Sequence, residues 1–211
     1  MFISRVEIPW DAARNPYEIH RRLWRLFPGE ERETRGGIED ARQGFLFRVE
    51  EQGTGSPTRV LVQSRFAPTH AEGVNLIGSR EFQPAPRMGQ RLAFVLTANP
   101  VKTIVDAQLE AKPGKQSAKC RVPLIKEDAQ REWLARKLAG AAEVEDLDIL
   151  PHAPLYFRKG QRGGKLALCT FEGVVQVSSP TGLTALLENG IGPAKAFGCG
   201  LLLVKPAHAI S

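Results

Sequence analysis

The chain has 211 residues, 42% of them apolar and 25% charged, which is typical of one folded domain or two small ones. It contains no apolar run near the roughly 20 residues that cross a bilayer, and residues 1–8 carry charge where a signal peptide is apolar. We therefore expect a cytoplasmic protein without membrane contact. Three widely spaced cysteines and four histidines form no metal-ligand motif, so we expect neither a metal nor another cofactor. The net charge of +6 favours a polyanionic partner without proving one.

The first half of the sequence predicts a strand, a helix and three further strands, with a weak segment before the last strand. Residues 2–8 are typical of a strand that Pro9 ends. Asn15 as N-cap, Pro16 in the first turn and Glu18 at the third position predict a helix that begins with a capping box. Its apolar stripe is Ile19, Leu23, Leu26 and Phe27. Strands are expected at 45–50 and 59–65, then a weak segment in the place of a second helix, then a short strand near 81–83.

The second half of the sequence repeats this order. A stretch rich in proline and glycine separates the halves, and we place a boundary near Arg87, giving domains 1–87 and 88–211. Strands are expected at 91–97, 147–157, 165–177 and 201–204, with helices at 126–139 and 181–188. Two consecutive βαββαβ units predict an α+β protein of two tandem ferredoxin-like, RRM-like domains, each a sheet with helices on one face.

A histidine lies at the border of the apolar stripe of the first helix. On a helical wheel of about 100° per residue, His20 flanks the stripe, while Tyr17, Trp24 and Arg21 fall on the solvent side. His20 therefore shares a surface with Tyr17 and Trp24. Such an imidazole can be partly desolvated and still reach a ligand, which suits general acid or base chemistry. On spacing alone, an ordinary histidine that is exposed to solvent or lies at the edge of the core is the favoured interpretation.

Residues 190–200 combine glycines with a lysine. The glycines are Gly190, Gly192, Gly198 and Gly200. Glycine lets backbone N–H groups approach a phosphate closely, and Lys195 adds a positive charge. The segment lacks the GK[ST] of a P-loop and the third glycine of a dinucleotide fingerprint, so no nucleotide cofactor is implied. A tight helix-to-strand connection is the alternative, but it would not need four glycines, and we favour contact with a phosphate backbone.

A basic, glycine-rich turn joins the strands expected at 147–157 and 165–177. Its cations are Arg158, Lys159, Arg162 and Lys165. Such a tip is a plausible wedge for a groove or backbone of a nucleic acid, although the charges could also simply keep an exposed hairpin soluble. Tyr156 and Phe157 alternate across the strand, so one of them should pack inward.

Several strings in this order resemble one family over nearly the whole chain, the CasE family of CRISPR-associated endoribonucleases, which are subunits of the type I-E Cascade complex. The matching strings are Asn15-Pro16-Tyr17-Glu18-Ile19-His20-Arg21, residues 97–103, residues 120–126, Phe171-Glu172-Gly173, and residues 190–195 continuing into 198–202.

The resemblance implies a metal-independent nuclease that cuts the repeat stem-loops of precursor CRISPR RNA and keeps the mature guide RNA bound within the Cascade antiviral complex. It implies that His20 is the catalytic histidine and that Tyr17 acts beside it. It also implies that Arg21, the basic hairpin and the glycine-rich segment bind the RNA. The hypothetical reaction is attack by a ribose 2′-hydroxyl on its own 3′-phosphate, with His20 as acid or base. The competing hypothesis is a scaffold subunit that binds RNA hairpins and cuts nothing.

Overall fold

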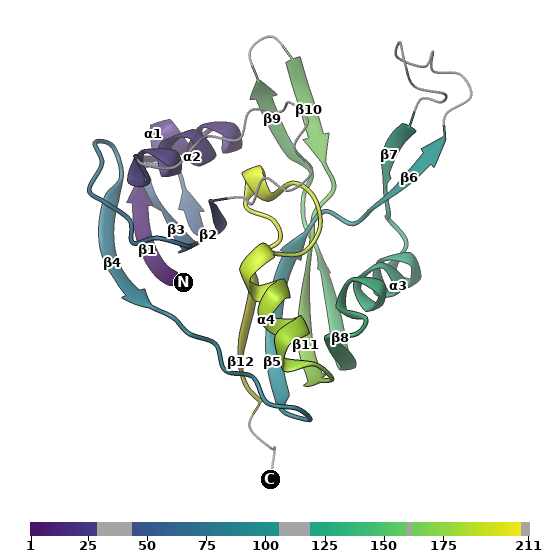
Figure 1. The fold of residues 1–211 in the computed structure, drawn as a ribbon. Coiled ribbons are helices and arrows are strands. Elements are labelled where there is room, and N and C mark those ends of the chain that lie inside the picture. Colours follow the sequence, from purple (N-terminus) through teal and green to yellow (C-terminus); the bar gives the residue numbers. More distant parts are fainter. Residues whose placement is uncertain (29–43, 106–118, 160–161, 208–211) are drawn as a thin grey trace, which may run out of the picture.

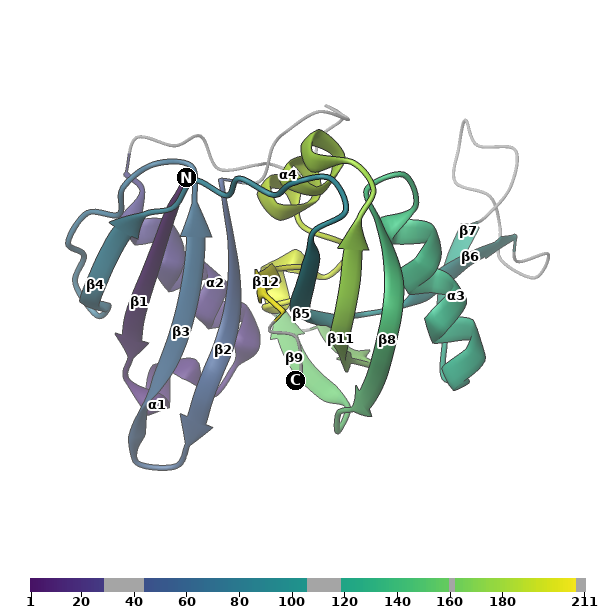
Figure 2. The same ribbon diagram turned by 90° about the horizontal axis from the view of Figure 1, so that it is seen from below.

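The computed structural model describes residues 1–28, 44–105, 119–159 and 162–207, which form two four-stranded antiparallel sheets placed side by side (Figures 1 and 2). The strand order is β2-β3-β1-β4 in the first sheet and β12-β5-β11-β8 in the second. Numbered within each unit, both contain the strand arrangement of a ferredoxin-like sheet. The predicted α+β class with two tandem ferredoxin-like units is confirmed.

The first unit packs one main helix on its sheet. The strands are β1 (Phe2–Ile8), β2 (Phe45–Gly53), β3 (Ser56–Ser64) and β4 (Asn75–Glu81), and the helices are α1 (Trp10–Ala13), α2 (Pro16–Leu23) and the 3₁₀ turn η1 (Trp24–Leu26). Alternate residues of β1, such as Val6 and Ile8, are fully buried in one core with Ile19 and Leu23 of α2. This is the pattern expected of a sheet with one covered face.

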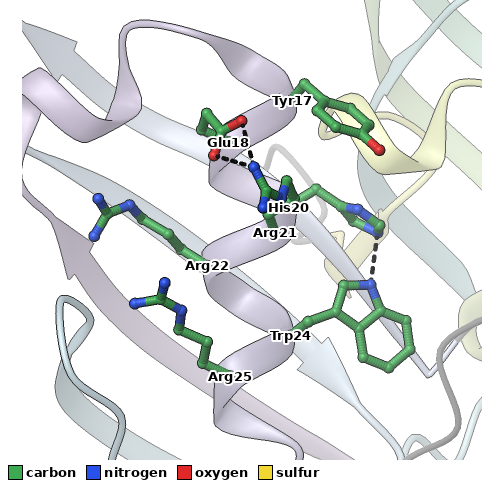
Figure 3. A pocket seen from close by; sticks show the side chains of 7 residues that line it. All are labelled: Tyr17, Glu18, His20, Arg21, Arg22, Trp24 and Arg25. Carbon is green, nitrogen blue, oxygen red and sulfur yellow. Dashed lines mark hydrogen bonds and ion pairs between the residues drawn. The ribbon is translucent and has the colours of Figure 1, made fainter. Parts of the chain in front are cut away.

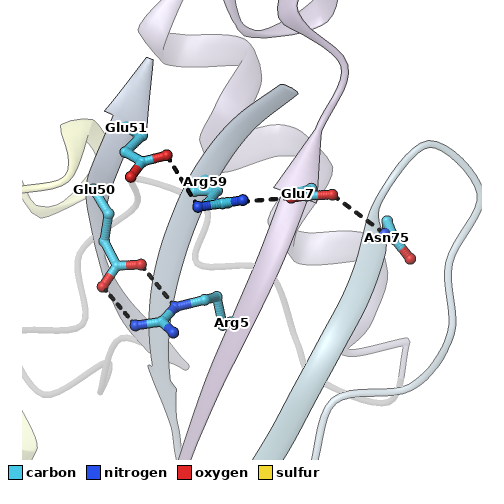
Figure 4. Close-up of polar contacts among 6 residues, drawn as sticks. All are labelled: Arg5, Glu7, Glu50, Glu51, Arg59 and Asn75. Carbon is cyan, nitrogen blue, oxygen red and sulfur yellow. Dashed lines mark hydrogen bonds and ion pairs between the residues drawn. The ribbon is translucent and has the colours of Figure 1, made fainter. Parts of the chain in front are cut away.

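The opposite face of the first sheet carries exposed ion pairs (Figure 4). Arg5 Nε lies 2.8 Å from a Glu50 carboxylate oxygen, and Arg59 reaches Glu7 at 3.3 Å and Glu51 at 3.1 Å. Exposed pairs of this kind contribute at most about 1 kcal/mol each. The polar face is therefore a solvated surface, and the unit is held together by the apolar core on the side of α2.

The second unit covers its sheet with two helices. Its sheet contains β5 (Arg91–Ala98), β8 (Ala142–Pro151), β11 (Cys169–Val177) and β12 (Leu202–Pro206), and its helices are α3 (Glu127–Leu138), α4 (Pro180–Asn189) and the 3₁₀ turn η2 (Lys195–Phe197). The core joins Leu96 of β5 and Phe171 of β11 to Leu134 of α3 and Leu187 of α4. None of the helices within the described ranges is long and apolar enough to cross a membrane.

Two hairpins project from the second unit. One pairs β9 (Leu155–Lys159) with β10 (Arg162–Leu166), and the other pairs β6 (Val101–Val105) with β7 (Lys119–Pro123). The single strand expected at 147–157 is instead divided between the end of β8 and the start of β9, with a break at residues 152–154. Pro151 precedes this break and Pro154 is its last residue, and proline cannot donate to a strand ladder. The β6–β7 hairpin was not predicted from the sequence.

The expected second helix of the first unit is absent from residues 65–74, all of which the structure describes. Both the N–H and the hydroxyl of Thr69 donate to the Leu26 carbonyl, at 2.8 and 3.0 Å, which holds the segment against the end of η1. The two units meet where Gln63 Nε2 donates to the Leu187 carbonyl at 2.6 Å. The domain boundary near residue 87 stays a prediction. It lies between the strands of the first sheet, within residues 2–81, and those of the second sheet, within residues 91–206.

Candidate active site

The start of α2 is fixed by Asn15, as predicted. Its backbone is extended, and its Oδ1 accepts a hydrogen bond from the Tyr17 N–H at 3.3 Å. The Glu18 carboxylate, which was expected to close a capping box, instead accepts two hydrogen bonds from Arg21 Nη1, at 3.0 and 3.1 Å. The predicted RNA contact Arg21 therefore carries a charge that Glu18 offsets in the free protein.

Asn15 also attaches α2 to the basic hairpin. Its Nδ2 donates to the Arg158 carbonyl at 2.9 Å, and the Arg158 N–H donates back to Asn15 Oδ1 at 3.4 Å. One side chain thus caps the helix and holds a strand 143 positions further along the chain. The sequence indicated only the cap, because an N-cap asparagine has a local signature and a partner in another domain has none.

A row of three aromatic rings joins the three candidate segments. Tyr17 of α2 lies 6.4 Å from Phe197 of η2, and Phe197 lies 4.3 Å from Phe157 of β9, measured between ring centroids. Phe157 is therefore the inward member of the Tyr156–Phe157 pair, while Tyr156 is 66% exposed. The first helix, the glycine-rich segment and the basic hairpin lie side by side.

His20 is half-buried between this row and the aromatic end of the first core. Its ring lies 5.4 Å from Phe45 and 6.2 Å from Phe47, and its Nε2 accepts a hydrogen bond from Trp24 Nε1 at 3.2 Å. Figure 3 shows Tyr17, His20 and Trp24 on the same side of the helix. Burial lowers the pKa of His20 to about 4, so the imidazole is neutral at pH 7.

The position of Trp24 corrects the helical-wheel prediction. The wheel placed it on the solvent side, but only 8% of it is exposed. The edge strand β2 brings Phe45 alongside Trp24, with the two ring centroids 5.1 Å apart, so the covered face of the helix extends beyond its aliphatic stripe. A wheel shows which residues share a face, and it cannot show how far a neighbouring strand reaches.

The helix borders a basic cavity of about 460 Å³, which His20 lines (Figure 3). Its lining residues are Tyr17, Glu18, His20, Arg21, Arg22, Trp24 and Arg25. Arg22 and Arg25 were missed by the sequence reasoning, because their spacings of two and five residues from His20 place them on another side of the helix (Figure 3). Their guanidinium groups donate to the carbonyls of Gly73 at 3.5 Å and Glu72 at 3.3 Å. Three arginines against one glutamate favour an anionic ligand.

Two of the four predicted hairpin cations border a second cavity, of about 670 Å³. Arg158 and Lys165 line it and are exposed, and Lys165 Nζ lies 5.8 Å from the centroid of the Tyr156 ring. Lys159 ends β9 and Arg162 begins β10, and only their backbone is described. The described cations of this cavity, which include Arg14, are not matched by an acidic lining residue. The cavity adjoins α2 through Asn15.

The four glycines of residues 190–200 have a structural reason, which corrects the expectation that a tight connection would not need them. All four have φ between 70° and 90°. A Cβ on Gly200 would lie 2.9 Å from the Ile191 carbonyl, and one on Gly192 would lie 2.8 Å from the Trp133 ring. Lys195 Nζ donates to the Asn189 carbonyl at 2.5 Å, at the end of α4. Contact between this segment and phosphate stays a prediction.

The arrangement suits proton transfer beside an anionic backbone. A neutral imidazole can accept a proton, a phenol lies next to it, and cations line the two adjacent cavities. Within the described ranges, no three histidine, cysteine, aspartate or glutamate side chains are grouped so as to hold a metal ion.

Comparison with known proteins gives full-length matches. A family model described as CRISPR associated protein matches residues 1–206. The chain is 39% identical to the Escherichia coli K12 protein named CRISPR system Cascade subunit CasE, over 98% of this chain and all of that protein. It is 34% identical to the CRISPR-associated endoribonuclease Cse3 of Thermus thermophilus, over 91% of this chain and 90% of that protein.

Solved structures show the same fold. The crystal structure of Cas6e from E. coli K-12 matches with a TM-score of 0.82 and 38% identity, over 98% of this chain and all of that chain. T. thermophilus Cse3, bound to an RNA representing a pre-cleavage complex, matches with a TM-score of 0.71 and 29% identity, over 97% of this chain and 99% of that chain.

Proposed function

Because the chain belongs to the CasE family of CRISPR-associated endoribonucleases, we propose that it cleaves precursor CRISPR RNA within the repeat stem-loops and keeps the mature guide RNA bound as a subunit of Cascade. The relatives named a Cascade subunit and an endoribonuclease cover nearly the whole chain, and one of them has been solved with RNA. The reaction takes place in the cytoplasm and uses no metal or other cofactor.

The reaction is an intramolecular transesterification. The 2′-hydroxyl upstream of the cut gives its proton to a base and its oxygen attacks the adjacent phosphorus, while the bond from phosphorus to the 5′-oxygen breaks and that oxygen takes up a proton from water. The products are a 2′,3′-cyclic phosphate and a 5′-hydroxyl end. We assign the base to His20, since burial keeps its imidazole neutral at pH 7 and a neutral imidazole can accept the proton. Tyr17 orients one of the reacting oxygens.

The cations around α2 bind the RNA backbone. Arg158 and Lys165 are exposed beside the cavity that adjoins Asn15, and Lys159 and Arg162 occupy the ends of the same hairpin strands. Arg21 borders the cavity that His20 lines, and its pairing with Glu18 can be exchanged for a phosphate. The glycine-rich segment, including Lys195, lies against α2 and contacts the phosphates near the cut.

One observation carries this assignment. The half-buried His20 opens onto a basic cavity, while a single asparagine and an aromatic row hold the basic hairpin and the glycine-rich segment against the same helix. A scaffold that only binds RNA hairpins would need the cations but not the neutral imidazole.

The test is cleavage of a synthetic repeat RNA in EDTA by the wild type and by His20→Ala. General acid–base catalysis is worth about 10²–10⁴-fold, so the variant should lose that much in rate and still bind the RNA. The control is His70→Ala, because His70 is exposed, lies between β3 and β4 and lines neither cavity. Equal cleavage by His20→Ala would refute the assignment, and a wild type that binds without cutting would indicate the scaffold.

A second test concerns the hairpin. Arg158→Ala combined with Lys165→Ala should reduce the slope of log affinity against log salt by about one to two. Lys205→Ala is the control, because Lys205 is exposed on β12, outside both cavities. An unchanged slope in the double variant would remove the hairpin from the interface.

A further inference from the structure

The hydrogen bond between Trp24 and His20 identifies which imidazole nitrogen carries the proton. An indole N–H can only donate, so His20 Nε2, at 3.2 Å from Trp24 Nε1, must be the acceptor. A neutral imidazole has one protonated nitrogen and one with a free lone pair. The proton of neutral His20 therefore lies on Nδ1, and its basic lone pair lies on Nε2.

The indole is held in place from two sides. Trp24 is 8% exposed, and its ring packs edge-on against both His20 and Phe45, with centroids 6.0 and 5.1 Å away. The spacing of four residues on a continuous helical segment places Trp24 next to His20. The buried partner of this pair is fixed, whereas the half-buried imidazole borders the cavity.

We propose that Trp24 is a positioning residue for His20: its indole N–H holds the imidazole in the Nδ1–H tautomer and makes Nε2 the atom that accepts the proton of the ribose 2′-hydroxyl. This inference rests on the proposed function. On RNA binding the 2′-hydroxyl takes the place of the indole N–H at Nε2. Its O–H bond then breaks, the proton passes to Nε2, and the electron pair stays on the oxygen that attacks phosphorus.

None of the other described groups around His20 donates a hydrogen bond to its ring. On the strand side, Phe45 and Phe47 are uncharged. On α2 and η1, the cavity is lined by Tyr17, by Glu18 paired with Arg21, and by Arg22 and Arg25, which donate to backbone carbonyls. Beyond Tyr17, η2 contributes Phe197 and Lys195, whose Nζ donates to Asn189, and β9 contributes Arg158. The one hydrogen bond described for the His20 ring comes from Trp24.

The direct test is the ¹⁵N spectrum of the His20 ring in the full chain without RNA. The wild type should show the Nδ1–H tautomer at pH 7. Trp24→Phe keeps an aromatic ring but removes the N–H donor together with part of the buried ring, so it should give a mixture of tautomers and a His20 pKa higher by about one unit. Phe45→Leu is the matched control, since it loosens the packing of the same ring but keeps the donor. It should retain the Nδ1–H tautomer.

Cleavage at subsaturating RNA connects the tautomer to the reaction, because kcat/KM reports the pKa of the free enzyme, in which the indole still donates to Nε2. The acidic limb of the pH dependence of kcat/KM should move to higher pH in Trp24→Phe by the amount seen in the RNA-free titration, and it should move less in Phe45→Leu. An Nε2–H tautomer in the wild type would overturn the proposal, and this result needs no variant. An unchanged tautomer in Trp24→Phe would also overturn it. A wild type that does not cleave RNA would refute the proposed function and leave the tautomer result standing.

Discussion

Asn15 has two roles that substitutions can separate: it caps α2, and it attaches the basic hairpin to that helix. Asn15→Ala removes the cap and both bonds to the Arg158 backbone. An N-cap is worth about 1 kcal/mol, and two partly exposed hydrogen bonds contribute about 0.5 kcal/mol each. We therefore expect a loss of about 2 kcal/mol in the free energy of unfolding.

Two further variants divide this loss. Asn15→Asp keeps a good N-cap acceptor but removes the donor to the Arg158 carbonyl, so it should lose about 0.5–1 kcal/mol. Ser179→Ala removes the cap of α4, where Ser179 Oγ accepts from the Gly182 N–H at 3.1 Å. It should lose about 1 kcal/mol and leave the hairpin unchanged.

The assays are urea unfolding of the full chain, amide hydrogen exchange of β9 and β10, and affinity for a repeat RNA. Both Asn15 variants should speed exchange in the hairpin and weaken RNA binding, whereas Ser179→Ala should do neither. If Asn15→Ala and Ser179→Ala give the same hairpin exchange, the asparagine acts as a cap alone, and the reasoning on its second role is refuted.

Two further substitutions test the packing and the electrostatics of the site. A Cβ at Gly164 would overlap the Phe157 ring, so Gly164→Ala should displace the hairpin and weaken RNA binding. Gly163→Ala is the control, because its Cβ would meet only a carbonyl at 4.0 Å, and it should bind RNA normally. Equal RNA affinities of the two variants would contradict this prediction. The pKa of His20 is lowered to about 4 from an ordinary value of about 6.5. The contribution of His20 to the free energy of unfolding should therefore be complete above pH 6.5, and the wild type should lose up to about 3 kcal/mol of that free energy as the pH falls to 4. His20→Phe should lack this part of the pH dependence in urea unfolding, and parallel curves for the two proteins would show that the imidazole is not buried as described.

Local chemistry made the start of α2 predictable. The Asn15-Pro16 pair specifies an N-cap and a first turn through its own backbone preferences, and the structure has both. The place of His20 at the edge of the apolar stripe follows from helical spacing, and the side chain is half-buried. These features depend on residues within one or two turns of each other.

Contacts between distant segments could not be predicted in the same way. The burial of Trp24 depends on Phe45, which belongs to the edge strand β2. The segment 65–74, where a helix was expected, is held against the end of η1 by the bonds from Thr69 to the Leu26 carbonyl. The glycines at 192 and 200 are required by Trp133 and by the Ile191 carbonyl, and composition alone made them look like a phosphate-binding loop.

The most direct test of the central claim, that a metal-free imidazole assists attack by the ribose itself, is cleavage in EDTA of a repeat RNA with a single 2′-deoxy nucleotide immediately upstream of the cut. The account predicts that this RNA binds normally and stays intact, whereas an RNA with the 2′-deoxy nucleotide one position downstream is cut at the normal rate. Cleavage of the first RNA would contradict the account.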